Sequence, residues 1–373
     1  MRPVDLDRAT FDRFAAASGE VLVSIFLPTQ VRGDEVDQGR IRLKNLLADA
    51  DEALQTVGWR SRQRDARLTQ ARDLLDDVEF WQHQQHGLVV YVDEEGHCTS
   101  VALPAGADER VVVANTFHLR PLLPSLEPLE LPVLALTMSG VRLYRVTQEA
   151  IRKVPADLPK SFEDVNWFVD REKQRQQHAD RAGGQGLRHG HEPSDARHED
   201  VSRFLRAVED AIPPTDSADA LIVLGDVDLV ARFAVLSERE ILAGRHVADV
   251  DDEADLREAA GPLLVERERS AMSALLDIAR THLSTESAIT DLAEALEAAV
   301  SGRVDRLLLR RELAPAWGRF DPATLELSID REQRPLLVDL YDRLAVHAMG
   351  TGAAVTTTKE AIDGRDFVAV PRY

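Results

Sequence analysis

One stretch of the sequence, DRAGGQGLRHGHEPSDARHED at residues 180–200, gathers residue types that could contribute to chemistry. It holds glycines, a glutamine, a proline and three histidines, which are His189, His191 and His198. Imidazoles in an H-x-H pair are acceptable metal ligands. No cysteine accompanies them, and the nearby acids are typical of a helix start, where the helix dipole favours negative charge. The pattern therefore predicts neither a metal site nor a cofactor.

The same stretch offers groups that could contact RNA. Imidazoles stack on bases or bond to phosphate, and guanidinium groups pair with phosphate. The candidate RNA-binding residues are Arg188, His189, His191 and Arg197. A solvated loop without such a role is the alternative that these residue types leave open. Few apolar anchors offset the entropy of ordering, so we expect residues 176–193 to be the least ordered internal segment.

The elements on either side of this stretch would have to position it. Before it, VLALTMSGVRLYRVT at residues 133–147 predicts a hairpin that turns at Ser139 and Gly140. After it, SDARHEDVSRFLRAVEDAI predicts an amphipathic helix that ends before Pro213. The apolar face of this helix is formed by Val201, Phe204, Leu205, Val208 and Ile212. With the strand ALIVLG and the helices that follow it, this block predicts an α/β unit.

The block before it combines helices and strands. A buried strand at residues 21–28 precedes two long amphipathic helices, at residues 39–57 and 62–82. The first helix is expected to bury one stripe, formed by Ile41, Leu43, Leu46, Leu47, Ala50 and Leu54. Three strand-like pieces follow, in one of which the single cysteine, Cys98, is expected to be a buried small hydrophobe without redox chemistry.

The last block alternates helices and strands over some ninety residues, which predicts a small three-layer α/β domain. Its predicted elements include a helix at residues 334–350 and a loop with Trp317 and Phe320. This loop is expected to pack against its own domain, with docking to a partner or RNA as the alternative. Proline-rich and polar linkers separate the three blocks. The predicted domains are therefore residues 1–127, 128–283 and 284–373.

Composition limits the classes of function. The chain has 373 residues and a formal net charge of -20, and an acidic surface repels phosphate backbones. We therefore expect no DNA partner, and any RNA contact needs a local neutral or basic patch. Apolar runs are too short to span a bilayer and the N-terminus lacks a signal-peptide core, which predicts a cytoplasmic protein without a membrane partner. The sequence contains no Walker phosphate loop, dinucleotide glycine fingerprint or G-x-S-x-G nucleophile elbow.

Several motifs together resemble one protein family. In order along the chain they are VSIFLPT, IRLKNLLADADEAL, FHLRPLLP, HGH before FLRAVEDA, GRVDRLLLRRELAPAWGRFDP and a terminal RY. This set resembles the bacterial members of the archaeo-eukaryotic release factor and Pelota superfamily. The resemblance implies an N-terminal α/β domain, a central domain of ribonuclease-H-like topology, and a C-terminal three-layer α/β/α domain like the kink-turn-binding ribosomal proteins.

The resemblance also gives the opening stretch a possible reaction. In the translation terminators of this superfamily, a Gly-Gly-Gln tripeptide of the central domain reaches the peptidyl-transferase centre, where the peptidyl-tRNA ester is hydrolysed. It therefore implies that Gly183, Gly184 and Gln185 are the catalytic residues. Two glycines permit a close approach that a Cβ would forbid, and a glutamine can position water without carrying a charge. Its backbone N–H could stabilise the developing oxyanion.

Two classes of function stay open on this basis, both with the ribosome and tRNA as partners and with a translational GTPase as a candidate partner. The first is an enzyme-like role, in which a release-factor mimic in the ribosomal A site hydrolyses peptidyl-tRNA during ribosome rescue. The second is a binding role without hydrolysis, in rescue or hibernation. A more distant alternative is a cytoplasmic module that kept the fold but not the ribosome.

Overall fold

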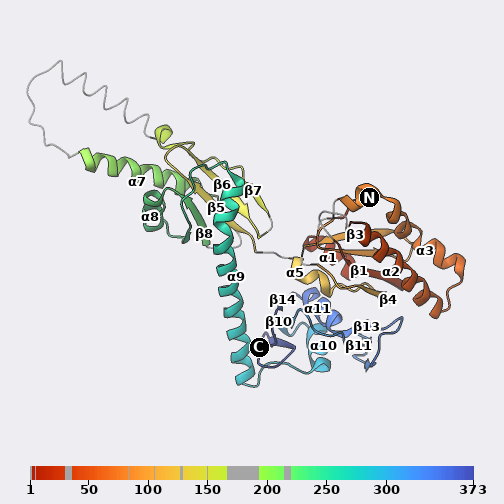
Figure 1. The fold of residues 1–373 in the computed structure, drawn as a ribbon. Helices are drawn as coiled ribbons and strands as arrows, with labels where there is room; N and C mark the ends of the chain where they lie inside the picture. The colour runs from red at the N-terminus through yellow and green to blue at the C-terminus, as the bar shows by residue number, and fades with distance from the viewer. Residues whose placement is uncertain are drawn as a thin grey trace, which may run out of the picture. The chain divides into compact units, whose positions relative to one another are not determined.

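The computed structural model describes residues 2–4, 6–29, 36–82, 84–104, 106–126, 129–148, 150–165, 193–213 and 220–373. Helices and several sheets alternate along the chain, so the expected α/β class is confirmed (Figure 1). The chain divides into two compact units. One unit combines an N-terminal part, Met1–Pro128, with a C-terminal part, Ser273–Tyr373, and the other is the central unit, Leu129–Met272.

The N-terminal part is built on one antiparallel sheet with the strand order β3-β2-β1-β4. Successive side chains of a strand point to opposite faces, and both faces of β1 are apolar. Val21, Val23 and Ile25 pack under α2, α3 and α4, whereas Leu22 and Phe26 pack with α1 on the other face. The strands are β1 (Ser18–Pro28), β2 (Gly87–Val92), β3 (Cys98–Leu103) and β4 (Arg110–Thr116). The helices are α1 (Arg8–Ala16), α2 (Val36–Thr56), α3 (Ser61–Asp73), η1 (Leu74–Asp76), α4 (Val78–Gln82), η2 (Arg120–Leu122) and α5 (Leu123–Leu126).

Two details of the helix predictions were wrong. The helix expected at residues 62–82 is interrupted, because Asp77 accepts a hydrogen bond from the Phe80 N–H and so caps a new turn at α4. Ile41 is 59% exposed, although the rest of the predicted stripe in α2 is buried. Ile41 precedes Leu43 by two residues, which places it about 200° away around the helix.

This difference predicts unequal effects of truncation on stability. Leu43→Ala should lower the free energy of unfolding by about 3–5 kcal/mol, because Leu43 is fully buried. Ile41→Ala, on the same helix, should change it by less than about 0.5 kcal/mol. Urea unfolding of both variants would check this, and a large loss of stability in Ile41→Ala would contradict the exposed position.

Strand order in the central unit is β7-β6-β5-β8-β9. The hairpin partner β6 is antiparallel to β5 and β7, and β8 and β9 continue parallel to β5. This is the ribonuclease-H-like arrangement that the resemblance implies. The predicted hairpin turn at Ser139 and Gly140 is confirmed, since the Thr137 N–H donates to the Gly140 carbonyl. The strands are β5 (Leu131–Leu136), β6 (Val141–Val146), β7 (Ile151–Lys153), β8 (Ala220–Gly225) and β9 (Glu240–Ala243).

Helices cover both faces of this central sheet. The predicted apolar face of α7 (Pro193–Ala211) is confirmed, because Val201, Phe204, Leu205 and Val208 are buried in one cluster with α8 (Val227–Leu236). The opposite face of the sheet packs against Leu256, Ala260 and Leu264 near the start of α9 (Glu253–Ser284).

The C-terminal part contains the predicted three layers. Its sheet, with the order β14-β10-β15, has Leu307 and Leu309 packed in one cluster with α10 and α11, and Leu308 packed against the last turns of α9. The elements are α10 (Leu292–Val300), β10 (Val304–Arg310), α11 (Leu340–Gly350), β14 (Ala354–Thr358) and β15 (Phe367–Pro371). This α/β/α layering agrees with the class expected from the sequence.

A second small sheet in the C-terminal part was not predicted. The stretch expected to be a loop contains β11 (Trp317–Phe320), which pairs with β12 (Leu327–Ile329) and β13 (Val338–Asp339). The predicted helix at 334–350 was too long, since α11 begins only at Leu340. Trp317 is buried in the core of the C-terminal part, which confirms the expected packing of Trp317 against its own domain. Each of the four sheets takes its strands from one predicted domain, and the three-domain division itself stays a prediction.

Candidate functional site

Most of the sequence-predicted site residues lie outside the described residues. This applies to Gly183, Gly184, Gln185, Arg188, His189 and His191. Arg197 belongs to α7, but its side chain also lies outside the described set. The roles of these residues, and the expected disorder of residues 176–193, therefore stay predictions.

The structure does describe both chain segments that flank residues 166–192, and they contact each other at the carboxyl end of β5. On the N-terminal side, the Phe162 N–H donates a 3.0 Å hydrogen bond to the Met138 carbonyl. On the C-terminal side, the Phe204 ring of α7 lies with its centroid 5.8 Å from that of Phe162, in an edge-to-face arrangement. This contact, in the core formed by β5, β6, α7 and α8, fixes where the flanking segments lie.

A hollow of about 400 Å³ lies beside these flanking segments. Its lining residues are Met138, His198, Val201, Asp226, Asp228, Leu229 and Arg232. They meet because β5 and β8 are parallel neighbours, with Leu136 in register with Gly225, so that their carboxyl ends share one edge. After β5 the chain continues to β6 on one side of this strand pair, and after β8 it continues to β9 on the other side. In α/β sheets, ligands bind in the crevice that forms where the connections diverge in this way.

One of the two acids that line this hollow, Asp226, has a local structural role. The Asp226 carboxylate caps α8 by accepting a 3.1 Å hydrogen bond from the Asp228 N–H. His246 supports the same turn, with Nδ1 placed 2.9 Å from the Gly225 carbonyl oxygen. The lining of the hollow combines the carboxylates of Asp226 and Asp228 with the guanidinium group of Arg232. Sequence reasoning missed Asp226 and Arg232, although polar residues directly after a buried strand are a usable signal.

Basic side chains gather on β6 and β7 around a second hollow, of about 550 Å³. The carboxylate of Asp251 accepts hydrogen bonds from Arg142, at 3.0 and 3.2 Å, and from Lys153, at 2.8 Å. These hydrogen bonds lower the pKa of Asp251. Lys160, also in the lining, is exposed and has no ion-pair partner within the described ranges. Arg142 and Lys153 thus share the carboxylate of Asp251, and the lining of the hollow also contains Asp157 and Lys160.

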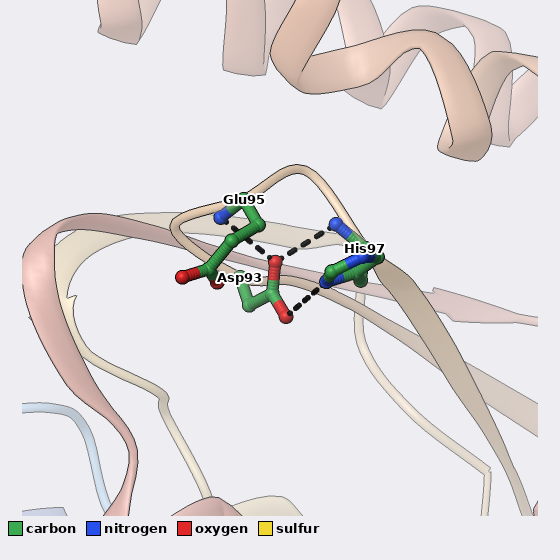
Figure 2. Close-up of side chains that lie close together, drawn as sticks. All are labelled: Asp93, Glu95 and His97. Carbon is green, nitrogen blue, oxygen red and sulfur yellow. Dashed lines mark hydrogen bonds and ion pairs between the residues drawn. The ribbon is translucent and has the colours of Figure 1, made fainter.

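Three possible metal ligands lie together in the turn between β2 and β3. Figure 2 shows Asp93, Glu95 and His97, whose ligand atoms all lie within 4.8 Å of one another. Asp93 Oδ1 accepts the N–H groups of Glu95 at 3.0 Å and His97 at 2.8 Å, and Oδ2 lies 3.2 Å from His97 Nδ1. Sequence reasoning did not select this group. Both oxygens of Asp93 hold the turn, which accounts for the arrangement without a ligand.

Cys98 follows this turn at the start of β3 and is buried. Burial, with the carboxylates of Asp73 and Asp93 as smaller contributions, raises the pKa of its thiol to about 12. The thiol is therefore protonated at neutral pH and is a poor nucleophile. This confirms the expectation of a small buried hydrophobe.

Comparisons with known proteins found one family match and several similar solved structures. Residues 132–303 match the model of bacterial archaeo-eukaryotic release factor family 3. The archaeal translation termination factor aRF1 is a similar solved structure, with 14% identity, 99% of each chain covered and a TM-score of 0.24. Archaeoglobus fulgidus Pelota is similar at 12% identity, over 77% of this chain and 79% of that chain, with a TM-score of 0.32. None of the curated proteins compared with the chain matches it.

The matched residues contain the central sheet apart from Leu131, the first residue of β5, so the family match and the strand order describe the same release-factor-like segment. The recognition made from the sequence is confirmed for residues 132–303, which match the model of bacterial archaeo-eukaryotic release factor family 3. Within the described ranges, no helix combines the length and the apolar character that crossing a membrane requires.

Proposed function

We propose that the protein acts in translation as a release-factor mimic that enters the ribosomal A site and hydrolyses peptidyl-tRNA. The observation that carries this proposal is the family match over residues 132–303, which includes the tripeptide at Gly183, Gly184 and Gln185. The anchored flanking segments support it, because the Phe162–Phe204 contact gives the tripeptide segment a fixed base on the central sheet.

Local charge supports contact with RNA. Residues 166–192 contain five arginines and lysines and four aspartates and glutamates, whereas the whole chain has a net charge of -20. A phosphate backbone approaching this segment therefore does not meet the repulsion that it would meet on an acidic surface. The histidines and Arg188 of the segment add groups that bond to phosphate or stack on bases.

The proposed reaction is hydrolysis of an ester. A water molecule, positioned by the Gln185 side chain, adds its oxygen to the ester carbonyl carbon. The Gln185 N–H stabilises the oxyanion that forms. The bond to the ribose oxygen then breaks, that oxygen takes up a proton, and the products are a peptide carboxylic acid and tRNA. The ribosome supplies most of the remaining site.

A second candidate is occupancy of the A site without hydrolysis. The spacing after the tripeptide favours it, because α7 begins only at Pro193 while the tripeptide ends at Gln185. A helix that starts almost directly after the tripeptide is what the resemblance leads one to expect. In this reading Arg188, His189 and His191 contact RNA and no bond is broken. A translational GTPase is a candidate partner in both cases.

Co-sedimentation with ribosomes across a salt series tests both candidates. The purified protein should pellet with ribosomes at low salt and dissociate as salt rises, because phosphate contacts release counterions. A combined R188A, H189A and H191A variant should weaken binding. Arg269→Ala, an exposed arginine of α9 that pairs with Glu266, is the control and should bind as the wild type does. Failure of the wild type to pellet even at low salt would remove both candidates.

A further inference from the structure

Buried apolar residues of the N-terminal and C-terminal parts of the first unit pack together in common clusters. Val112 and Ala114 of β4 belong to the same core as the helices of the C-terminal part. In the opposite direction, Val346 and Met349 of α11 pack with the aromatic residues on the α1 face of the N-terminal sheet. The two parts of the unit therefore complete each other's cores.

A buried carboxylate of α11 caps a helical turn of the N-terminal part. Asp342 Oδ1 accepts the N–H groups of Leu119, at 2.6 Å, and Arg120, at 2.5 Å, where η2 begins. The first N–H groups of a helical turn have no partner within it. Asp342 is 2% exposed. The N–H groups of Leu119 and Arg120 therefore depend on its carboxylate, and not on bulk solvent, for a hydrogen-bond partner.

Arg120 makes the reciprocal contacts with the C-terminal part. Its Nε lies 2.9 Å from Asp339 Oδ2, and its Nη1 donates a 2.9 Å hydrogen bond to the Leu313 carbonyl. Asp339 Oδ1 in turn accepts the N–H groups of Ala316 and Tyr341, at 3.2 and 3.1 Å, and so caps α11. The C-terminal part thus caps η2 through Asp342, and the N-terminal part pairs Arg120 with the carboxylate that caps α11.

The electrostatic environment makes each member of this cluster depend on the others. Burial raises the pKa of Asp339 to about 6, against the attraction of Arg120, and burial also raises the pKa of Asp342. His118, 3.6 Å from Asp342 Oδ1, is held neutral because burial and then Arg120 lower its pKa well below 6.5. Removing one partner of a buried charge pair leaves the other uncompensated, which is strongly destabilising.

We propose that His118, Arg120, Asp339 and Asp342, here called the Asp342 cluster, couple the N-terminal and C-terminal parts into one cooperative folding unit. Opening of one part leaves buried donors and charges without partners in the other. The two parts therefore unfold together, although the central unit, Leu129–Met272, separates them in sequence. The FHLR motif at residues 117–120 has its role here, as the N-terminal half of this connection.

Hydrogen exchange on the full chain tests this coupling. Leu308→Ala removes a buried side chain from the α9 face of the C-terminal sheet, in a cluster without N-terminal residues. It should speed exchange in β10 and β15 by at least about a hundredfold, the equivalent of a buried leucine truncation. Coupling requires β1 and β2 to accelerate by a comparable factor. Acceleration confined to the C-terminal part would overturn the proposal. Val370→Ala, a smaller truncation in the same cluster, replaces Leu308→Ala if that variant does not fold.

A second set of variants assigns the coupling to the cluster. In an Asp342→Ala background, the Leu308→Ala effect on β1 and β2 should fall at least about tenfold below its effect on β10 and β15. Asp342→Asn should keep the coupling, because the amide oxygen still accepts both N–H groups. The control Asp305→Ala removes an exposed carboxylate that pairs with Arg306 on β10 and should also keep it. Equal acceleration of both parts in the Asp342→Ala background would overturn the role of the cluster. If Asp342→Ala does not fold, Asp339→Asn replaces it, because the amide nitrogen would face Arg120 Nε where Asp339 Oδ2 now lies and so would break this ion pair.

Discussion

Replacing Gly184 with alanine is expected to abolish release of peptide from ribosome-bound peptidyl-tRNA while ribosome binding stays nearly intact. This follows from the proposed function, in which the Gly-Gly-Gln tripeptide approaches the ester closely. A methyl group at Gly184 restricts the backbone and blocks that approach. Gln185→Ala should cost less, about one or two powers of ten in the release rate, because its backbone N–H remains and only water positioning is lost. Single-turnover release assays on purified complexes measure both.

The control for this prediction is Gly190→Ala, which adds the same methyl group in the same segment but outside the tripeptide. It should reduce release far less than Gly184→Ala. Co-sedimentation in parallel separates loss of binding from loss of chemistry. If the wild type binds ribosomes and releases nothing, the hydrolase proposal fails and occupancy of the A site stands. If Gly184→Ala releases peptide at the wild-type rate, the tripeptide is not the catalytic element.

Sequence patterns predicted those parts of the fold that local periodicity determines. The apolar face of α7, with Phe204 and Val208, is confirmed because a 3.6-residue repeat is visible without knowledge of the partner. Ile41 was assigned to the wrong face because it was grouped by its apolar character rather than by its angle around α2. The strand β11 was missed because its pairing with β12 and β13 lies in a stretch without a clear alternating pattern.

For the candidate site too, local sequence patterns indicate some residues, and only the fold brings in the others. The tripeptide could be selected because it is contiguous in sequence and matches a motif that the resemblance supplies, and its catalytic role stays a prediction. Asp226 and Arg232 were not found, because they join Met138 only through the parallel pairing of β5 and β8. The FHLR motif was seen, but its partners Asp339 and Asp342 follow more than two hundred residues later. No local pattern reports a contact of that sequence separation.

The largest structural effect is expected at Gly225, where β8 ends beside β5. Its φ of +141° lies in a region that L side chains rarely adopt, and a Cβ built there would lie 1.9 Å from the Leu136 carbonyl oxygen. That oxygen cannot move away easily, because it accepts a 3.1 Å hydrogen bond from the Asp226 N–H in a strand paired on both sides. Gly225→Ala must therefore separate β5 from β8 at the centre of the sheet.

Gly225→Ala should thus cost more than about 4 kcal/mol, which combines backbone strain with a clash that no side-chain rotation relieves. In hydrogen exchange on the full chain, β5 and β8 should lose most of their protection, whereas β1 and β2 of the other unit provide an internal reference that stays protected. Gly350→Ala is the matched control, since a Cβ at the exposed end of α11 meets no atom within 4 Å. It should be neutral or stabilise by up to about 1 kcal/mol. If β8 keeps wild-type protection in Gly225→Ala, the close approach of β5 and β8 does not require a glycine at this position.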